Sequence, residues 1–216
     1  MAKKELAMLA GGGHACVLLD ALERSGVRVN AIVDPAIAIG QRVFGVPVVG
    51  DDSWLDVVSV EDYMLVNGAG ALPRSTLRQR LFERGKQNGF VFIKVVHPAT
   101  TIGHDVELME GAQIMAGAIL QFGSRVHTNA VINTGARIDH GCEIGEHVFI
   151  GPGAILCGNV RAGPRAFIGA GAVVLPGIEI GTAAVIGSGA IVTKNVRAGT
   201  LVIGNPAIEK KEKLDK

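Results

Sequence analysis

The chain has 216 residues, of which 48% are hydrophobic, and its formal net charge is +1 at pH 7. These values are typical of a soluble globular protein of one or two domains, and such a balance of charge argues against nucleic acid or an anionic membrane as a partner. The amino-terminal segment has charges and only a short apolar run, so we expect no signal peptide, no membrane-spanning helix and a cytoplasmic location. Cys16, Cys142 and Cys157 form no CxxC pair, which fits a reducing compartment.

Residues 1–96 alternate apolar, strand-like runs with charged, helix-like runs. The run "ELAMLA" predicts a strand, "CVLLDALERSG" a helix, and "VRVNAIVD" a second strand. The buried face of this helix is expected to hold Val17, Leu18, Ala21 and Leu22. Further strands are predicted at "VPVVG", "YMLVNG" and "FVFIKVV", with a helix at "RSTLRQRLFERGKQNG". This alternation predicts a small α/β, Rossmann-like domain with a parallel sheet and helices on its faces.

From Ile102 onward the sequence repeats with a period of six. The aliphatic positions are Ile102, Leu108, Ile114, Leu120, Val126, Ile132, Ile138, Ile144, Ile150, Leu156, Ala162, Ile168, Val174, Ile180, Ile186 and Val192. A small or β-branched residue often follows four residues later, as at Ala112, Ala118, Ser124, Ala130, Ala136, Cys142, Ala154 and Ala172. A strict period of six predicts short strands joined by tight turns, with three hexads per triangular coil and a central column of aliphatic side chains.

Four motifs carry a resemblance to a known family: "AGGGHA", "INTGARIDHGCEIGE", "GPGAILCGNVRAG" and "VIGNPA". The repeats resemble those of the hexapeptide-repeat acyltransferases, which form a left-handed parallel β-helix, an exception to the usual right-handed crossover. Nearly the whole chain resembles the acetyltransferases that act on nucleotide-linked amino sugars and on sialic acids. The resemblance implies a nucleotide-sugar-binding domain (1–96), a β-helix acetyltransferase domain (97–203) and a tail (204–216). It also implies acetyl-CoA as the donor, no metal, and a homotrimer.

The chemistry of acetyl transfer points to His140, the single imidazole of "IDHGC". A sugar ammonium has no free lone pair until a base removes a proton, and histidine titrates near neutrality. His140 lies two residues after the inward Ile138, so we expect it at the outer surface or an edge. Gly158, eighteen residues on, is expected to leave open space beside the imidazole. In the family that the chain resembles, the histidine of this motif is the catalytic base, at an interface between subunits.

Two positions depart from the family pattern. Gly141 stands where the family commonly has Asp or Glu to raise the basicity of the histidine. Asp139 is the nearest substitute, although adjacent strand residues point in opposite directions. Phe149 stands where the family tends to have a second histidine that meets acetyl-CoA, and His147 lies two residues before it.

The resemblance also places ligand contacts along the coils. Acetyl-CoA contacts are expected at Phe149 and at the backbone of Gly158, Ala170 and Ser188, with Gly204–Ala207 ("GNPA") near the adenine end. Asn133 is expected to hydrogen-bond the acceptor, although an asparagine can equally cap a turn.

The run "AGGGHA" follows a predicted strand and opens a predicted helix. Small residues permit a close approach of the backbone, and a helix N-terminus favours phosphate oxygens. Asp34, at the end of the second strand, has the spacing of a ribose-binding acid. Cys16 replaces the third glycine of a dinucleotide motif, so one nucleotide fits better than NAD. The resemblance implies that the nucleotide is bound by Gly12, Gly13, His14, Asp34, Pro35 and Gly68. For His14, the start of a helix without a ligand is the alternative.

Three alternatives stay open at this point. A γ-carbonic-anhydrase-like metalloenzyme uses the same helix, and His104 and His140 could share a face, but Gly145 stands where a third ligand is needed. A non-catalytic scaffold is the second alternative. Within the acetyltransferases, the acceptor is a UDP- or GDP-linked 4-amino-4,6-dideoxy sugar of bacterial surface glycan biosynthesis, or a sialic acid that is O-acetylated.

Overall fold

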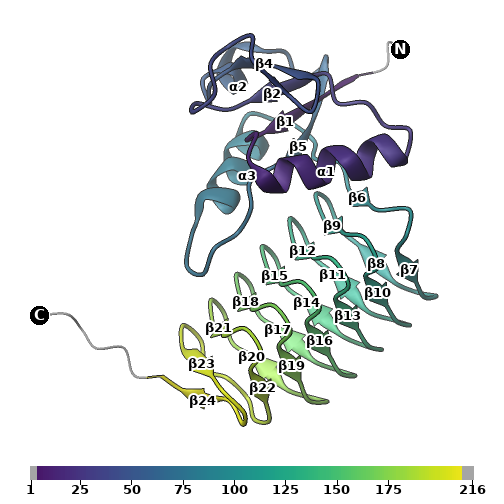
Figure 1. Cartoon of the computed structure of the whole chain (residues 1–216), viewed down its shortest axis with the longest axis vertical. Coiled ribbons are helices and arrows are strands. Elements are labelled where there is room, and N and C mark those ends of the chain that lie inside the picture. Colours follow the sequence, from purple (N-terminus) through teal and green to yellow (C-terminus); the bar gives the residue numbers. More distant parts are fainter. Residues whose placement is uncertain (1–3, 211–216) are drawn as a thin grey trace, which may run out of the picture. The chain divides into compact units, whose positions relative to one another are not determined.

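The computed structural model describes residues 4–210. The chain divides into two compact units, Met1–Pro98 and Ala99–Lys216. Figure 1 labels the helices and strands of both units. Each unit is described by itself below.

The first unit is built around a five-stranded sheet in the order β3-β4-β2-β1-β5. Its strands are β1 (Glu5–Leu9), β2 (Ala31–Val33), β3 (Arg42–Val43), β4 (Val46–Gly50) and β5 (Tyr63–Asn67). All neighbours pair in parallel except β3, which forms an antiparallel hairpin with β4. The expected strand "FVFIKVV" is shorter than predicted: Phe92 makes one bridge to Leu65, and β6 covers only Val95–Val96. The predicted open, largely parallel sheet is confirmed.

Three helices belong to this unit: α1 (Gly13–Arg24), α2 (Trp54–Val57) and α3 (Leu77–Gln87). Leu18, Ala21 and Leu22 are buried on α1 as predicted, whereas the Val17 side chain is 46% exposed. Ala15 and Leu19 are buried as well, and Ala15, Leu18, Leu19 and Leu22 follow the i, i+3, i+4, i+7 spacing of a helix face. The predicted face is therefore confirmed except at Val17.

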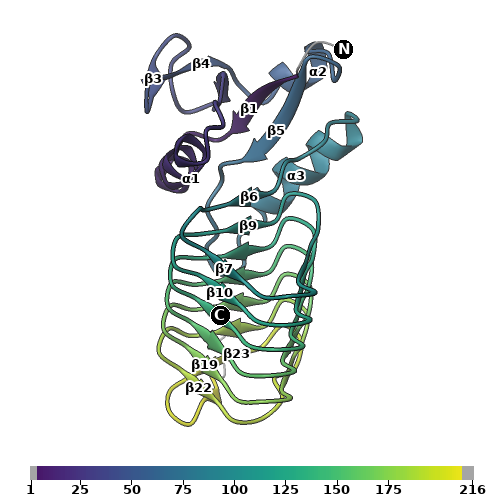
Figure 2. The same ribbon diagram turned by 90° about the vertical axis from the view of Figure 1, so that its right-hand side faces the viewer.

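The second unit is a left-handed parallel β-helix of two-residue strands, whose stacked rungs Figure 2 shows. Sheet 1 contains β7 (Thr101–Ile102), β10 (Ile119–Leu120), β13 (Arg137–Ile138), β16 (Ile155–Leu156), β19 (Val173–Val174) and β22 (Ile191–Val192). Sheet 2 contains β8 (Glu107–Leu108), β11 (Arg125–Val126), β14 (Glu143–Ile144), β17 (Arg161–Ala162) and β20 (Glu179–Ile180). Sheet 3 includes β9 (Gln113–Ile114), β12 (Val131–Ile132), β15 (Phe149–Ile150), β18 (Phe167–Ile168), β21 (Val185–Ile186), β23 (Leu201–Ile203) and β24 (Ile208–Glu209).

The predicted coil of three hexads is confirmed by the register of these sheets. Leu120 pairs with Ile138 and Ile138 with Leu156, so equivalent aliphatics lie eighteen residues apart on neighbouring rungs. The hexad positions from Ile114 to Val192 are buried, whereas Ile102, at the first rung, is 40% exposed. The column of aliphatic side chains is therefore the core of the β-helix.

We predict that Ile150→Ala lowers the free energy of unfolding by about 2–5 kcal/mol, because it leaves a cavity in this close-packed column. The Ile150 side chain is fully buried. Chemical denaturation followed by circular dichroism measures the effect. Glu179→Ala is the matched control, since this side chain lies on the outside of β20 and its removal is expected to change little. An equal loss in both variants would contradict the assignment of the core.

The carboxyl-terminal segment begins with further regular structure. β24 is antiparallel to β23, so part of the segment expected as a tail from residue 204 is an ordered hairpin. The last part of that predicted tail, residues 211–216, lies outside the described residues. Within residues 4–210, no helix combines the length and the apolar character needed to span a bilayer.

Candidate active site

Two corners of the β-helix carry the predicted site residues. The turns 103–106, 121–124, 139–142, 157–160 and 175–178 join sheet 1 to sheet 2, and we name them the His140 corner. The turns 115–118, 133–136, 151–154, 169–172 and 187–190 join sheet 3 to sheet 1, and we name them the Asn133 corner. Because sheet 1 lies between these corners, its outer face separates the two groups of predicted residues.

His140 projects from the second position of its turn and is exposed. Its imidazole lies directly against Gly158 on the next coil: a Cβ added to Gly158 would be 2.5 Å from both Cε1 and Nε2. The space that the missing side chain provides is therefore filled by the imidazole, not left open beside it as expected. Among the described residues, neither ring nitrogen has a hydrogen-bond partner, so both are available to a ligand.

The Asp139 carboxylate does not orient the imidazole. Its Oδ1 accepts a hydrogen bond from the backbone N–H of His140 at 2.7 Å. Gly141 has a φ of +65°, and a Cβ there would be 2.5 Å from Oδ1 of Asn159. A glutamate at Gly141 is thus strained by the positive φ, and its Cβ also clashes with Asn159. The chain supports its histidine by packing on Gly158 and not by an adjacent carboxylate.

The remaining predicted residues of the β-helix lie away from His140. Ala170 and Ser188 are exposed and occupy the same position of successive turns in the Asn133 corner. Asn133 lies in that corner too, and its Oδ1 accepts hydrogen bonds from the backbone N–H of Thr134 at 2.7 Å and the Thr134 hydroxyl at 3.3 Å. Asn133 therefore makes hydrogen bonds within its own turn, as the turn-capping alternative predicts. Phe149 is on sheet 3, where its ring stacks on that of Phe167 with centroids 5.1 Å apart.

His147 belongs to neither corner. It lies in the turn 145–148, which joins sheet 2 to sheet 3, and its Nδ1 accepts a hydrogen bond from Nδ2 of Asn129 at 2.9 Å. His127, which lies in the same third corner one coil earlier, is in direct contact with Glu143 of sheet 2. His147 is therefore on a different corner from His140, and it does not take the place that Phe149 occupies.

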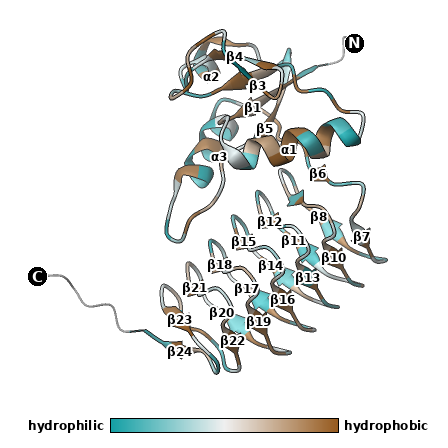
Figure 3. Cartoon of the chain, in the orientation of Figure 1, coloured by the Kyte–Doolittle hydropathy of each residue, from teal (hydrophilic) through white to brown (hydrophobic). Residues whose placement is uncertain are grey.

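The outer faces of sheets 1 and 2 have opposite character. The outward residues of sheet 2 are Glu107, Arg125, Glu143, Arg161 and Glu179, an alternating ladder of acids and bases that is teal in Figure 3. Ion pairs join Arg125 to Glu107 at 3.3 Å and Arg161 to Glu179 at 3.6 Å. Four outward residues of sheet 1, Ile119, Ile155, Val173 and Ile191, are aliphatic and half-buried, whereas the other two, Thr101 and Arg137, are polar and exposed. The outer face of sheet 1, between the two predicted corners, is thus mainly apolar, whereas the outer face of sheet 2 is charged and suited to contact with solvent.

In the first unit, the glycine loop, residues 10–13, follows β1 and leads into α1. Gly12 and Gly13 are exposed, and a Cβ on either would meet no atom within 4 Å, so no neighbouring group explains the absence of a side chain. The Asp34 carboxylate lies beside the loop: Oδ2 accepts from the N–H of Gly11 and Oδ1 from the N–H of Ala36, each at 2.7 Å. Asp34 therefore ties the glycine loop to the segment after β2.

At Gly68, the other predicted glycine, the absence of a side chain has a steric explanation. A Cβ there would be 2.5 Å from the carbonyl oxygen of Ala10 and 2.8 Å from that of Leu9, so only glycine lets β5 end so close to β1. Pro35 is exposed in the segment after β2, and His14 is half-buried in the first turn of α1. These residues surround the carboxyl ends of β1, β2 and β5, where ligands of open α/β sheets bind.

Sequence reasoning missed Arg78, which holds the loop after β5. Its Nη1 donates to the carbonyl oxygens of Asn67 at 3.0 Å and Ala69 at 2.8 Å, and Nδ2 of Asn67 donates to the carbonyl oxygen of Arg78 at 2.8 Å. Burial lowers the pKa of Arg78 to about 9. Nothing in the helical run "TLRQRLFERG" distinguishes this arginine from its exposed neighbours, because its partners lie outside the helix, in the loop that follows β5.

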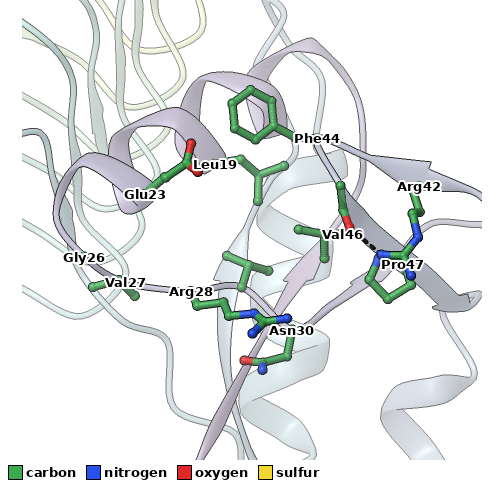
Figure 4. A pocket seen from close by; sticks show the side chains of 12 residues that line it. Leu19, Glu23, Gly26, Val27, Arg28, Asn30, Arg42, Phe44, Val46 and Pro47 are labelled. Atoms are coloured by element: carbon green, nitrogen blue, oxygen red, sulfur yellow. Dashed lines mark hydrogen bonds between the residues drawn. The ribbon is translucent and has the colours of Figure 1, made fainter.

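A cavity of about 380 Å³ opens elsewhere in this unit, between the last turns of α1 and the β3–β4 hairpin. Figure 4 shows Leu19, Phe44 and Val46 around it, with Arg42 hydrogen-bonded to the carbonyl oxygen of Gly45 at 2.6 Å. The cavity is at the amino ends of β2 and β4, since Asn30 and Val46 line it. It is therefore separate from the glycine loop. Within residues 4–210, no three His, Cys, Asp or Glu side chains are grouped as a metal site requires.

Comparisons with known proteins agree with this architecture. The bacterial transferase hexapeptide (six repeats) family model matches residues 123–158 and 163–194. No curated protein matches the chain. A solved structure of a perosamine N-acetyltransferase variant from Caulobacter crescentus, in complex with CoA and GDP-perosamine, is 36% identical with a TM-score of 0.90. The match covers 98% of this chain and 99% of that chain.

Two further structures are similar over nearly their whole length. The acetyltransferase domain of PglB from Neisseria gonorrhoeae FA1090, in complex with acetyl coenzyme A, is 30% identical with a TM-score of 0.88, covering 97% of this chain and 100% of that chain. WeeI from Acinetobacter baumannii AYE is 25% identical with a TM-score of 0.85, covering 96% and 100%. The chain therefore belongs to the hexapeptide-repeat acetyltransferases with a left-handed β-helix, and it is an enzyme of acyl transfer.

Proposed function

We propose that the protein transfers the acetyl group of acetyl-CoA to the amino group of a nucleotide-linked 4-amino-4,6-dideoxy sugar, in the cytoplasm, for bacterial surface glycan biosynthesis. The observation that carries the proposal is the similarity to perosamine N-acetyltransferase, which extends over nearly all of both chains at 36% identity. That enzyme was crystallised with CoA and GDP-perosamine. Because the match includes the first unit, the similarity covers the part that would hold a nucleotide as well as the β-helix.

His140 is proposed as the general base. The sugar nitrogen attacks the carbonyl carbon of the thioester, a C–N bond forms, and the C–S bond then breaks. The imidazole accepts the proton that the nitrogen loses, and the departing CoA sulfur takes up a proton. The exposure of His140 and its two unpartnered ring nitrogens support this role, since a base must reach the substrate within hydrogen-bond distance.

The first unit is proposed to hold the nucleotide. Gly12 and Gly13 leave an open space at the N-terminus of α1, where backbone N–H groups favour phosphate oxygens. Asp34 already accepts two backbone N–H groups, but each carboxylate oxygen retains a further acceptor site for a ribose hydroxyl. His14 and Pro35 flank this space, and Gly68 shapes it through the backbone. Neither the glycine loop nor Asp34 distinguishes uracil from guanine.

In the β-helix, acetyl-CoA is proposed to follow the coils after His140. Gly158 lies beside the base, and Ala170 and Ser188 offer backbone groups in the Asn133 corner. Asn133 in that corner is the proposed contact to the acceptor, and Asp139 supports the turn of the base. Phe149 is a proposed apolar contact from sheet 3. Because sheet 1 separates the two corners, ligands that touch both fit best where a neighbouring subunit packs on this face.

The mainly apolar face of sheet 1 supports a homotrimer, because soluble monomers avoid extended apolar patches. We predict that Ile155→Glu, in the middle of this face, converts the trimer to monomers and abolishes most activity. Light scattering at micromolar concentration measures the mass of the particle. Arg161→Glu on the charged face of sheet 2 is the matched control and is expected to remain trimeric. A wild-type protein that is already monomeric would contradict the shared site.

The test of the proposed function is CoA release measured against a panel of acceptors. The panel contains GDP- and UDP-linked 4-amino-4,6-dideoxy sugars, the same nucleotide sugars with the 4-amino group already acetylated, and free sialic acid. We expect turnover only with a free 4-amino group on a nucleotide-linked sugar. Turnover with sialic acid and none with the amino sugars would instead establish O-acetylation.

A further inference from the structure

The turn that carries His140 is closed differently from the turns of the other two corners. There, the fourth residue of a turn donates its backbone N–H to the carbonyl of the first, as from Ala136 to Asn133 at 3.0 Å and from Ala130 to His127 at 3.2 Å. Within the described residues, no such bond closes the turn 139–142, and none closes the turns 157–160 and 175–178 of the same corner. The turn of His140 differs from these two open turns because a side chain bridges its ends.

The Ser124 hydroxyl makes this bridge. Its Oγ donates to the carbonyl oxygen of Asp139 at 2.8 Å and accepts from the backbone N–H of Cys142 at 3.3 Å. Asp139 and Cys142 are the first and last residues of the turn, so the hydroxyl bridges the two ends with His140 and Gly141 between them. Ser124 is fully buried one coil before His140, so water does not compete for these bonds.

The sequence pattern makes this hydroxyl unusual. At the other two corners the fourth turn position is Thr100 in the first turn, Thr200 in the last, and Ala or Val between them, as at Ala112, Ala118, Ala130, Ala136, Val148, Ala154, Ala166, Ala172, Ala184 and Ala190. In the His140 corner, the same column reads Val106, Ser124, Cys142, Val160 and Ile178. The two polar members thus lie in the turn of His140 and the turn one coil before it.

Cys142 continues the connection to the next coil. Its Sγ donates to the carbonyl oxygen of Cys157 at 3.2 Å, and Cys157 immediately precedes Gly158, on which the imidazole rests. The backbone N–H of Asn159 also donates to the carbonyl oxygen of His140 at 2.8 Å. The turn of the histidine is therefore joined to the coil before it through Ser124 and to the coil after it through Cys142 and Asn159.

We infer that Ser124 is a positioning residue for His140: its buried hydroxyl ties the two ends of the turn together and so keeps the imidazole against Gly158, aimed at the acceptor. This inference rests on the proposed role of His140 as the base. Without the hydroxyl, the Cys142 amide and the Asp139 carbonyl either remain unpaired in a dry site or close on each other. Either change moves the two residues between them.

Ser124→Ala tests the inference by kinetics. We expect kcat to fall roughly 10- to 100-fold, since a small misplacement of a catalytic group is costly, while KM for acetyl-CoA changes less than about twofold. The pH profile of kcat should shift as well, and Ser124→Cys, which keeps a weaker donor, should retain an intermediate rate. Val160→Ala is the matched control in the same column, because it removes buried carbons but no hydrogen bond.

A spectroscopic readout separates this inference from the proposed function. The Cε1–H signal of His140, assigned by its absence in His140→Ala, should shift and titrate differently in Ser124→Ala but not in Val160→Ala. Unchanged kinetics and an unchanged signal in Ser124→Ala would overturn the inference. If His140→Ala keeps its full rate, the proposed base is wrong, and the His140 signal alone then decides whether Ser124 positions the ring.

Discussion

Replacing His140 with alanine is expected to lower kcat by roughly 10²–10⁴ and to leave the fold intact. The imidazole is exposed and outside the aliphatic column, so its removal costs little burial. The substrate ammonium then has no base to remove its proton at neutral pH. Affinity for acetyl-CoA should change little, because the resembled family contacts this ligand mainly through the backbone. Initial rates between pH 6 and 9 and calorimetric titration with CoA measure both effects.

His104→Ala is the matched control for this variant. His104 occupies the equivalent turn position two coils earlier and is also exposed, so the substitution removes the same group from a similar environment. It is expected to keep near-full activity. A His140→Ala enzyme that retains its rate across the pH range would show that the amine loses its proton without this imidazole.

Replacing Gly158 with alanine is expected to lower kcat roughly 10- to 100-fold, although glycine and alanine differ by one methyl group. The new Cβ would lie 2.5 Å from Cε1 and Nε2 of His140, which is far inside van der Waals contact. The imidazole must therefore leave its present position. Because no carboxylate of the described residues holds the ring, displacement from Gly158 removes its principal support.

A double variant identifies the imidazole as the group that clashes. In chemical denaturation, Gly158→Ala should destabilise the wild-type protein by no more than about 1 kcal/mol, because the exposed imidazole can swing away from the new methyl group. In the His140→Ala background the same change should cost much less, since the clashing ring is gone. Equal costs in both backgrounds would mean that the strain comes from the backbone of the coil and not from His140.

The β-helix was predictable from the sequence because its physical cause repeats. One aliphatic every six residues leaves one side chain per strand for the core, and the pairing of Leu120, Ile138 and Leu156 follows from three hexads per coil. The buried face of α1 was less certain, since "ACVLLDAL" offers several overlapping apolar stripes. Packing against the sheet, and not the periodicity alone, buries Leu19 and exposes Val17.

The candidate site was predictable in its residues but not in its contacts. The motif identifies His140, and the eighteen-residue spacing identifies Gly158 as its neighbour. That the imidazole fills the space of the missing side chain depends on its rotamer, which no spacing encodes. Ser124 looked like another small residue of the hexad, because its hydroxyl acts on the turn eighteen residues later.

The glycines of the first unit show the same limit. From the sequence, Gly12, Gly13 and Gly68 share one expected role, the binding of a nucleotide. Gly68 has an internal reason to be glycine, because β1 and β5 end in close contact, whereas Gly12 and Gly13 have open space around them. Only coordinates separate a glycine needed for packing from one that a ligand can approach.

The proposed acetyl transfer is tested most directly by the product formed from acetyl-CoA and GDP-perosamine. We expect a product heavier by one acetyl group, joined through an amide at the sugar nitrogen as seen by NMR, and formed at a rate that collapses in His140→Ala. An ester on a sugar hydroxyl, or no transfer to this sugar or its UDP-linked counterpart, would contradict it.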